Sequence, residues 1–412
     1  MSDHKIRRRS LLLAAASAPI AGPAMAAATG ATDAGTATDA AQDHVDLTLR
    51  HPFYGSGPQA GIATPPQRHA IFMTFDLTTN DPRDLQLLLA RWSASIVQMQ
   101  KGETVGQVEP NRAHATALDT GEALDLGPAS LTVTVGFGPG LFDERLGLQA
   151  FRPAALRPLK QLPGDDFDPA LTGGDLSLQA CADDPQVAYH AIRVLARLAK
   201  STGAAATRWA VIGFGRASAG TGQTTPRNLL GFRDGTRNIS TPEQMEEFVW
   251  SDDPVWGAGG SYQVARKVRM QIESWDTNRV DHQNAVFGRH KVSGAPLSGE
   301  QEFDLPDFTA EGPDGLLIPA DSHISLAAHE HNNGLRILRR SYNYTDGINN
   351  LGMLDAGLLF ISYQNDPSGF EALQTRLGAH DALNEYIAHI GSAIFYTPPA
   401  VTEGSYIGAR MF

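Results

Sequence analysis

The stretch AIFMTFDL at residues 70–77 is followed by DPRDLQLLLARWSASIVQMQ at residues 81–100. The first stretch has the composition of a strand, and the second places its apolar residues at helical spacing behind an Asp-Pro start. Outward from this pair, the patterns predict strands at residues 131–138, 175–182 and 207–217 and a helix at residues 184–200. Together the six segments have the order strand, helix, strand, strand, helix, strand, which is that of a ferredoxin-like sheet.

The second half of the chain repeats this order of elements. We therefore predict an α+β fold made of two ferredoxin-like halves, residues 46–220 and 221–412, each with an antiparallel sheet and peripheral helices. The prediction rests on element order alone, because no sequence similarity between the halves is visible. The patterns of the second half indicate strands at residues 261–273, 323–329, 335–344 and 357–365, and helices at residues 275–290, 370–377 and 383–390.

Composition and charge exclude several classes of protein. The chain has 412 residues, of which 42% are hydrophobic and 19% charged, and this is ordinary for globular domains. Its formal net charge of -12 argues against binding to nucleic acid or to an anionic membrane surface. Cys181 is the only cysteine, so an intrachain disulfide and a zinc site of several thiolates are excluded. Any metal chemistry must use histidine, carboxylates or a cofactor.

The first residues have the features of an export signal. Residues 5–26 run from a basic cluster through a short, alanine-rich apolar stretch to a signal peptidase site before Ala27. The sequence Arg8-Arg9-Ser10-Leu11-Leu12 resembles a twin-arginine signal, and a plain Sec signal is the alternative. We predict a signal peptide at residues 1–26, a disordered leader at residues 27–45, no stable membrane span, and a mature protein that is periplasmic or secreted.

A glycine-flanked acid occurs in TPRNLLGFRDGTRN, residues 225–238. Gly231 and Gly235 lie on either side of Asp234 and let the backbone approach a flat or bulky group closely. The simpler interpretation is a hairpin turn, because Asp-Gly is among the strongest turn signals. A turn at Asp234-Gly235 would not need Gly231-Phe232 before it, so both interpretations stay open.

Three histidines lie close together in DSHISLAAHEHNNGLRILRRSYNY, residues 321–344. His323 opens a predicted strand, whereas His329 and His331 lie where that strand gives way to an Asn-Asn-Gly turn signal. The three form a candidate metal site, and ordinary structural histidines are the alternative.

Arg339 and Arg340 lie in the next predicted strand, where adjacent side chains point to opposite faces. One of them can therefore point inward, where an unpaired buried charge would be costly. An edge strand with both arginines partly solvated is the alternative.

Several ordered blocks of this chain resemble the dye-decolourising haem peroxidases. RNLLGFRDGTRN is similar to the Gly-x-x-Asp-Gly signature of that family, and DSHISLA is similar to the strand that carries its ligand histidine. ILRRSYNY resembles the strand that bears its distal arginine. With its twin-arginine leader, the chain is most similar to the exported group that includes the iron-uptake deferrochelatase/peroxidase. Three further blocks agree in order and spacing over residues 225–400, namely FGRHKVSGAPL, GLLFISYQND and GSAIFYTPPA.

One loop departs from the family pattern. Relatives usually carry an arginine two residues after the ligand histidine, and Asn-Pro-Arg shortly afterwards. This chain has Ser325 and Ala328-His329-Glu330 there, and its loop to Arg339 is shorter. We therefore expect altered contacts at the haem edge, with His329 as a candidate for the missing cation.

The resemblance implies the dimeric α+β barrel fold and a haem b cofactor with His323 as the iron ligand. It implies that Asp234 moves the peroxide proton and that Arg339 places a fixed positive charge near the departing oxygen. The expected substrates are hydrogen peroxide and a dye-like or phenolic reductant, and a homodimer is expected. The alternative is a haem-handling protein of iron uptake that works with an iron permease and releases iron from an intact porphyrin. The other expected haem contacts are Gly235, Thr236, Arg237, Ala328, His329, Glu330 and again Arg339.

Overall fold

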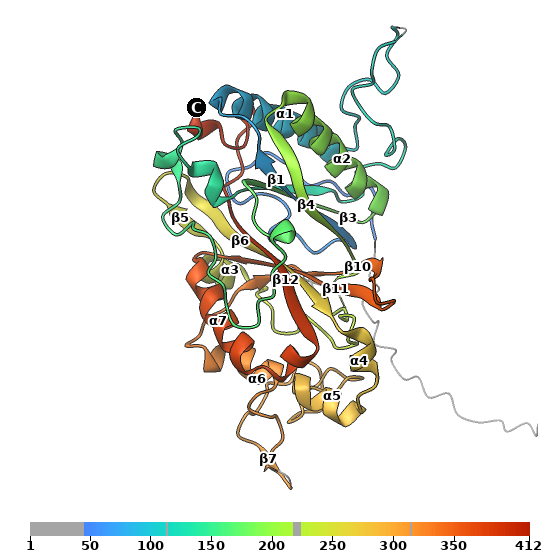
Figure 1. Ribbon diagram of the computed structural model, residues 1–412, viewed down its shortest axis with the longest axis vertical. Coiled ribbons are helices and arrows are strands. Elements are labelled where there is room, and N and C mark those ends of the chain that lie inside the picture. Colours follow the sequence, from blue (N-terminus) through green and yellow to red (C-terminus); the bar gives the residue numbers. More distant parts are fainter. Residues whose placement is uncertain (1–44, 113, 217–223, 314) are drawn as a thin grey trace, which may run out of the picture. The chain divides into compact units, whose positions relative to one another are not determined.

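The computed structural model describes residues 45–112, 114–216, 224–313 and 315–412 (Figure 1). The predicted signal peptide at residues 1–26, and all of the predicted leader except Val45, lie outside these residues. Within the described part of the chain, no helix combines the length and the apolar composition needed to cross a membrane.

The first half forms the ferredoxin-like sheet expected from the sequence. Its strands lie in the antiparallel order β2-β3-β1-β4. Both helices begin at an Asp-Pro pair, and the side chains of Asp81 and Asp184 accept hydrogen bonds from backbone N–H groups of the first turn. The elements are β1 (His69–Leu77), α1 (Pro82–Gln100), β2 (Thr132–Phe137), β3 (Leu176–Ala182), α2 (Pro185–Thr202) and β4 (Ala205–Phe214).

The second half has the same topology. Its long strands lie in the order β10-β11-β6-β12, which is again the second, third, first and fourth along the chain. This repeat confirms the predicted pair of ferredoxin-like halves. The long strands are β6 (Gly257–Met270), β10 (Tyr342–Ile348), β11 (Leu354–Gln364) and β12 (Ile387–Thr397), and the short ones are β5 (Ser251–Asp253), β7 (Glu311–Gly312), β8 (Gly315–Leu316) and β9 (Leu338–Arg339). The helices are α3 (Pro242–Phe248), α4 (Ile272–Asp276), α5 (Val280–Phe287), α6 (His323–Ala327) and α7 (Pro367–His380).

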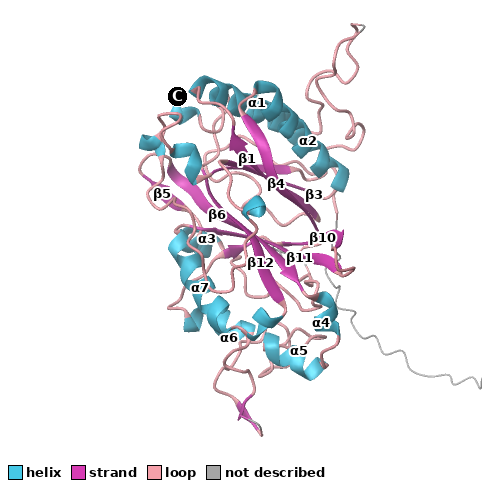
Figure 2. Ribbon diagram, viewed as in Figure 1, coloured by secondary structure: helices cyan, strands magenta, loops and turns pink. Residues whose placement is uncertain are grey.

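The two sheets join into a closed ring of strands. β4 pairs with β10, where Phe214 lies opposite Asn343, and β12 pairs with β2 through Tyr396 and Phe137. Aromatic and aliphatic side chains from both halves, Phe72 and Phe395 among them, pack together within the ring. Helices α1 and α2 pack on the first-half strands in Figure 1, and Figure 2 shows the other helices around the second half.

Four segments differ from the sequence predictions, and one of them is the predicted strand at residues 335–344, which is divided into β9 and β10. Residues 323–329 were predicted as a strand but form helix α6 followed by a 3-10 turn. Five alternating residues are too few to distinguish the two-residue period of a strand from the 3.6-residue period of a helix. The predicted helix at residues 383–390 is a 3-10 turn that leads into β12, where pairing with β6 outweighs the helical spacing. The predicted helix at residues 275–290 is divided between α4 and α5.

Candidate functional site

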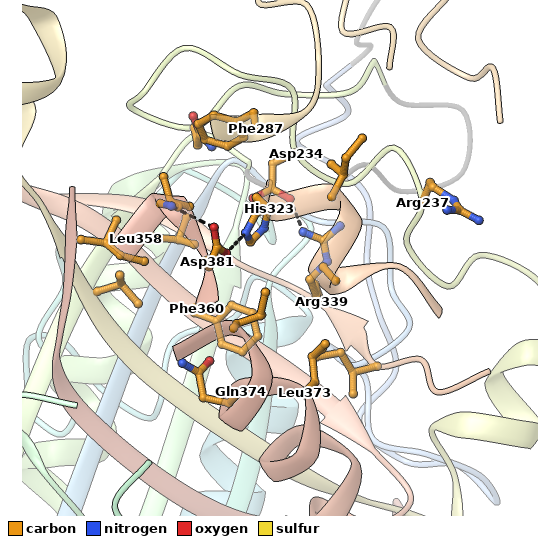
Figure 3. Close-up of a pocket in the computed structure, with 18 of the residues that line it drawn as sticks. Asp234, Arg237, Phe287, His323, Arg339, Leu358, Phe360, Leu373, Gln374 and Asp381 are labelled. Carbon is orange, nitrogen blue, oxygen red and sulfur yellow. Dashed lines mark hydrogen bonds and ion pairs between the residues drawn. The ribbon is translucent and has the colours of Figure 1, made fainter. Parts of the chain in front are cut away.

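A cavity lies between the second-half sheet and helices α6 and α7 (Figure 3). Val268 of β6 and Leu358 and Phe360 of β11 form one apolar wall, and Leu373 and Leu377 of α7 contribute another. Every lining residue belongs to the second half of the chain. Such apolar walls suit a flat organic group.

His323, the first residue of α6, is oriented by a buried carboxylate. Its Nδ1 atom donates a hydrogen bond to Oδ2 of Asp381 over 2.7 Å, as Figure 3 shows. Burial lowers the pKa of His323, but the facing Asp381 carboxylate outweighs it, and the pKa is raised from its ordinary value. Because Nδ1 is occupied, Nε2 is the ring nitrogen that remains to bind a metal, an arrangement often found in ligand histidines.

The sequence alone gives no indication of Asp381. Its side chain is 3% exposed, and Oδ1 accepts a hydrogen bond from the backbone N–H of Leu383 over 2.9 Å. An aspartate before a helical turn is an ordinary cap signal. Nothing local marks its contact with His323, which lies 58 residues earlier.

Asp234 and Arg339 form an ion pair in the same cavity. The backbone N–H of Asp234 donates to the carbonyl of Pro226 over 3.0 Å, and Gly231 and Gly235 have φ values of 87° and 106°, which favour glycine. The turn of this loop lies at residues 228–231, so the interpretation of Asp234-Gly235 as a plain hairpin corner is wrong. The loop instead presents the carboxylate to the cavity.

Asn238 fixes the backbone at Arg339. Its Nδ2 atom donates to the Arg339 carbonyl over 2.7 Å, and its Oδ1 atom accepts from the Arg339 N–H over 2.9 Å. Arg339 belongs to β9, which pairs with β11, and its side chain lines the cavity. The sequence pattern draws attention to the residues around Asp234, but it does not predict the contact between Asn238 and the backbone of Arg339.

Arg340 lies outside the cavity, which agrees with the opposite faces expected for the two arginines. The predicted strand at residues 335–344 is interrupted at this residue, between β9 and β10. Only 2% of Arg340 is exposed, and its guanidinium donates to the carbonyl of Thr64 and to Oε1 of Gln67. The alternative of two partly solvated arginines on an edge strand is therefore wrong.

Part of the cavity lining is positively charged. Nε2 of His329 lies within hydrogen-bond distance of the guanidinium groups of both Arg237 and Arg336. Burial and the Arg336 charge lower the pKa of His329, which favours a neutral imidazole that accepts. Glu330 does not line the cavity but pairs with Arg237 over 2.6 Å. This cationic part of the lining fits the carboxylates of an amphiphilic cofactor.

The three histidines of residues 321–344 do not converge on a metal site. Nδ1 of His331 donates to the carbonyl of Ser325 over 2.7 Å, and His329 contacts the two arginines instead. In the part of the chain that the structure describes, no group of three or more His, Cys, Asp or Glu side chains is arranged to hold a metal ion. His323 as a single protein ligand fits an iron whose other ligands come from a porphyrin. Gly235, Thr236 and Ala328 also line the cavity.

Family models match both halves of the chain. Residues 59–215 match the N-terminal model of the Dyp-type peroxidases, and residues 225–402 match the C-terminal model. The chain belongs to the Dyp-type peroxidase family. The match to the C-terminal model contains every residue that lines the cavity.

Curated relatives of this Dyp-type peroxidase include proteins named deferrochelatase. That of Yersinia pestis bv. Antiqua (strain Nepal516) is 38% identical over 373 residues, which cover 88% of this chain and 84% of the relative. That of Escherichia coli (strain K12) is 37% identical over 376 residues, which cover 88% of this chain and 87% of the relative. A solved structure, the X-ray generated oxyferrous complex of DtpA from Streptomyces lividans, is 37% identical, with a TM-score of 0.80 and coverage of 88% of this chain and 98% of that one.

Proposed function

We propose that this Dyp-type peroxidase binds haem b in the cavity and reduces hydrogen peroxide while it oxidises a dye-like or phenolic donor. One observation carries the proposal: an ion pair of a candidate proton carrier, Asp234, and a fixed cation, Arg339, lines the same apolar cavity as the carboxylate-oriented His323. A protein that only carries haem needs no such pair.

The residues of the cavity fit haem in three ways. His323 would hold the iron, the side chains of β6, β11 and α7 would enclose the porphyrin, and Arg237 and Arg336 would bind its carboxylates. Bound haem supplies an open iron position at which peroxide is reduced. Asp381 orients His323 and strengthens it as a donor.

Asp234 and Arg339 act on different atoms of the peroxide. The Asp234 carboxylate takes the proton from one oxygen and delivers it to the other. Arg339 keeps its charge at every working pH and stabilises the negative charge that develops on the departing oxygen. The ion pair holds the carboxylate in place, and Asn238 holds the backbone of the arginine.

A second candidate function is favoured by the names of the curated relatives. A deferrochelatase would release iron from haem and leave the porphyrin intact, and the same cavity would serve it. The test is a steady-state peroxidase assay of the haem-loaded protein, with released iron and free porphyrin measured in parallel. Peroxide turnover without iron release supports the first function, and iron release with slow turnover supports the second.

The proposal also covers the location of the protein and its protein partners. Arg8-Arg9 and the Ala-x-Ala site before Ala27 support export through the twin-arginine route, which carries proteins already folded around a cofactor. The resemblance to exported iron-uptake proteins supports a homodimer and cooperation with an iron permease. Sedimentation of the haem-loaded protein tests the dimer.

A further inference from the structure

Arg237, which we propose for the carboxylates of haem, already holds a carboxylate of this chain. Its Nη1 atom donates to Oε2 of Glu330 over 3.2 Å, and its Nη2 atom donates to Oε1 over 2.6 Å. Two parallel hydrogen bonds of this kind are the geometry in which a guanidinium binds a carboxylate most strongly. While Glu330 is in place, Arg237 cannot offer the same pair of donors to a carboxylate of haem.

His329 is a second partner of the same guanidinium. Nη2 of Arg237 lies 3.0 Å from Nε2 of His329, the nitrogen to which Arg336 also donates. Both Nη atoms of Arg237 therefore have partners within the protein, and a haem carboxylate that binds through these atoms must displace one of them. Like charges repel, so that carboxylate disfavours Glu330 as a neighbour more than it disfavours the neutral imidazole of His329.

Glu330 is also the partner that can be displaced at low cost. Its side chain is 41% exposed and does not line the cavity, whereas Arg237 is 26% exposed and does line it. Figure 3 shows Arg237 apart from the His323–Asp381 pair, at one side of the cavity. Exposed ion pairs contribute little to stability, because both charges remain well hydrated when they separate. Glu330 can therefore turn into water when another carboxylate takes its place.

We infer that Glu330 competes with the carboxylates of haem for Arg237 and thereby keeps haem binding in this cavity reversible. The inference rests on the haem binding proposed above. Without haem, Glu330 holds Arg237. With haem bound, Glu330 stays close enough to take Arg237 back when a haem carboxylate lets go. The exchange breaks and forms hydrogen bonds only, so it needs no further reactant.

The competition matters most if the protein releases iron and leaves the porphyrin intact. An iron-free porphyrin keeps its carboxylates but has no bond to His323. Its binding then depends on the apolar walls and on the two arginines, Arg237 and Arg336. A carboxylate that competes for Arg237 speeds its departure, so Glu330 serves the second candidate function more than the first.

Glu330→Gln tests the inference, because glutamine has the size of glutamate without its charge. Transfer of haem to an excess of apomyoglobin should be about fivefold slower from this variant than from the unmodified protein, since an exposed ion pair changes an affinity by up to about this factor. Transfer of iron-free protoporphyrin, followed by fluorescence, should slow as well. Glu311→Gln, at an exposed position of β7 outside the cavity lining, makes the same change of charge and should leave both rates unchanged.

Haem dimethyl ester separates this competition from a general effect on the cavity. It has no free carboxylate, so its transfer rate should be the same from Glu330→Gln and from the unmodified protein. Equal or faster transfer of haem or protoporphyrin from Glu330→Gln would overturn the inference, and faster transfer would mean that Glu330 positions Arg237 for haem. Slower transfer of the dimethyl ester from Glu330→Gln would also contradict it. If the unmodified protein binds no haem at all, the proposed function fails instead, so the two failures can be told apart.

Discussion

The guanidinium of Arg339 and the carboxylate of Asp234 form an ion pair, although 105 residues separate them in the sequence. Each is anchored by its own backbone contacts, Asp234 by Pro226 and Arg339 by Asn238. Removing one side chain should therefore leave the backbone of the other in place. The two roles in peroxide reduction can then be measured separately.

Arg339→Leu should slow the reaction with peroxide at least as much as Asp234→Asn, with haem still bound in both variants. Loss of a donor to developing negative charge typically costs about 10²–10³ in rate, and loss of a positioned acid or base costs about 10²–10⁴. Water can partly replace the base but not a fixed cation. Stopped-flow recording of the Soret change after mixing with excess peroxide measures both.

Arg279→Leu is the control for these variants, because the Arg279 side chain is 84% exposed and, within the described residues, its ion pair is with Asp281 two positions along the chain. Its rate should equal that of the unmodified protein. A normal rate in Arg339→Leu would exclude Arg339 from the chemistry.

Arg340→Leu should destabilise the protein rather than change its chemistry. The substitution removes the donor to the part-buried carbonyl of Thr64 and to the buried Oε1 of Gln67, and a buried acceptor left unpaired costs about 1–3 kcal/mol. Urea unfolding should show a fall in the free energy of unfolding of about 2 kcal/mol or more. A folded, fully stable Arg340→Leu that no longer reacts with peroxide would move the catalytic role from Arg339 to Arg340.

His323→Ala should abolish most haem binding or shift the haem spectrum strongly. Asp381→Asn should weaken haem binding less, by about 10–100-fold, because it loosens the ligand without removing it. Titration of the haem-free protein with haem, followed by absorbance, measures both affinities. His290→Ala, at an exposed position, is the control. Loss of haem in His329→Ala or His331→Ala, with normal binding in His323→Ala, would show that another histidine is the ligand.

Stability should fall in acid because of His389. Burial and the Arg266 charge lower the pKa of His389 to about 3, whereas an unfolded histidine titrates at about 6.5. The unfolded chain therefore takes up a proton first, so this contribution to stability is complete above pH 6.5 and is lost as the pH falls toward 3. The loss amounts to about 2 kcal/mol between pH 6.5 and 5.

Urea unfolding of the haem-free protein at several pH values checks this effect. His389→Leu should lack the part of the acid dependence that His389 causes, and the exposed His290→Ala should keep it. The same pH dependence in His389→Leu and in the unmodified protein would rule out His389 as its source.

Replacement of Arg8 and Arg9 by lysine should leave the precursor in the cytoplasm. The twin-arginine pair is the feature that separates this signal from a Sec signal, and lysine keeps its charge. Fractionation and N-terminal sequencing should show a mature start at Ala27 only for the unmodified protein. Normal export of the lysine variant would indicate the Sec route.

Local patterns predicted the strands and helices of the first half well, because both helices have a clear period and an Asp-Pro cap and the strands are runs of β-forming residues. The sequence also located His323, Asp234 and Arg339, through resemblance, and the structure brings all three to one cavity. The element that carries His323 was predicted wrongly, since HISLA is too short to distinguish alternation from a helical turn.

The supporting residues could not be predicted from the sequence. Asp381 and Asn238 act through partners 58 and 101 residues away, and neither lies in a pattern that differs from an ordinary turn or loop. Such contacts depend on how distant elements pack, which local periodicity does not encode. The start of β12 was predicted as part of a helix for a related reason, because its pairing with β6, which is distant in the sequence, makes it a strand.

The closed ring of strands has a consequence for how the protein can be divided. Taken alone, the first half would expose the unpaired edges of β2 and β4, and the second half those of β10 and β12. Open edges of this kind promote association with other chains. The second half contains the whole cavity, yet as a separate fragment it would be prone to aggregate. Protection of these edges is therefore a contribution of the first half that the chemistry of the cavity does not reveal.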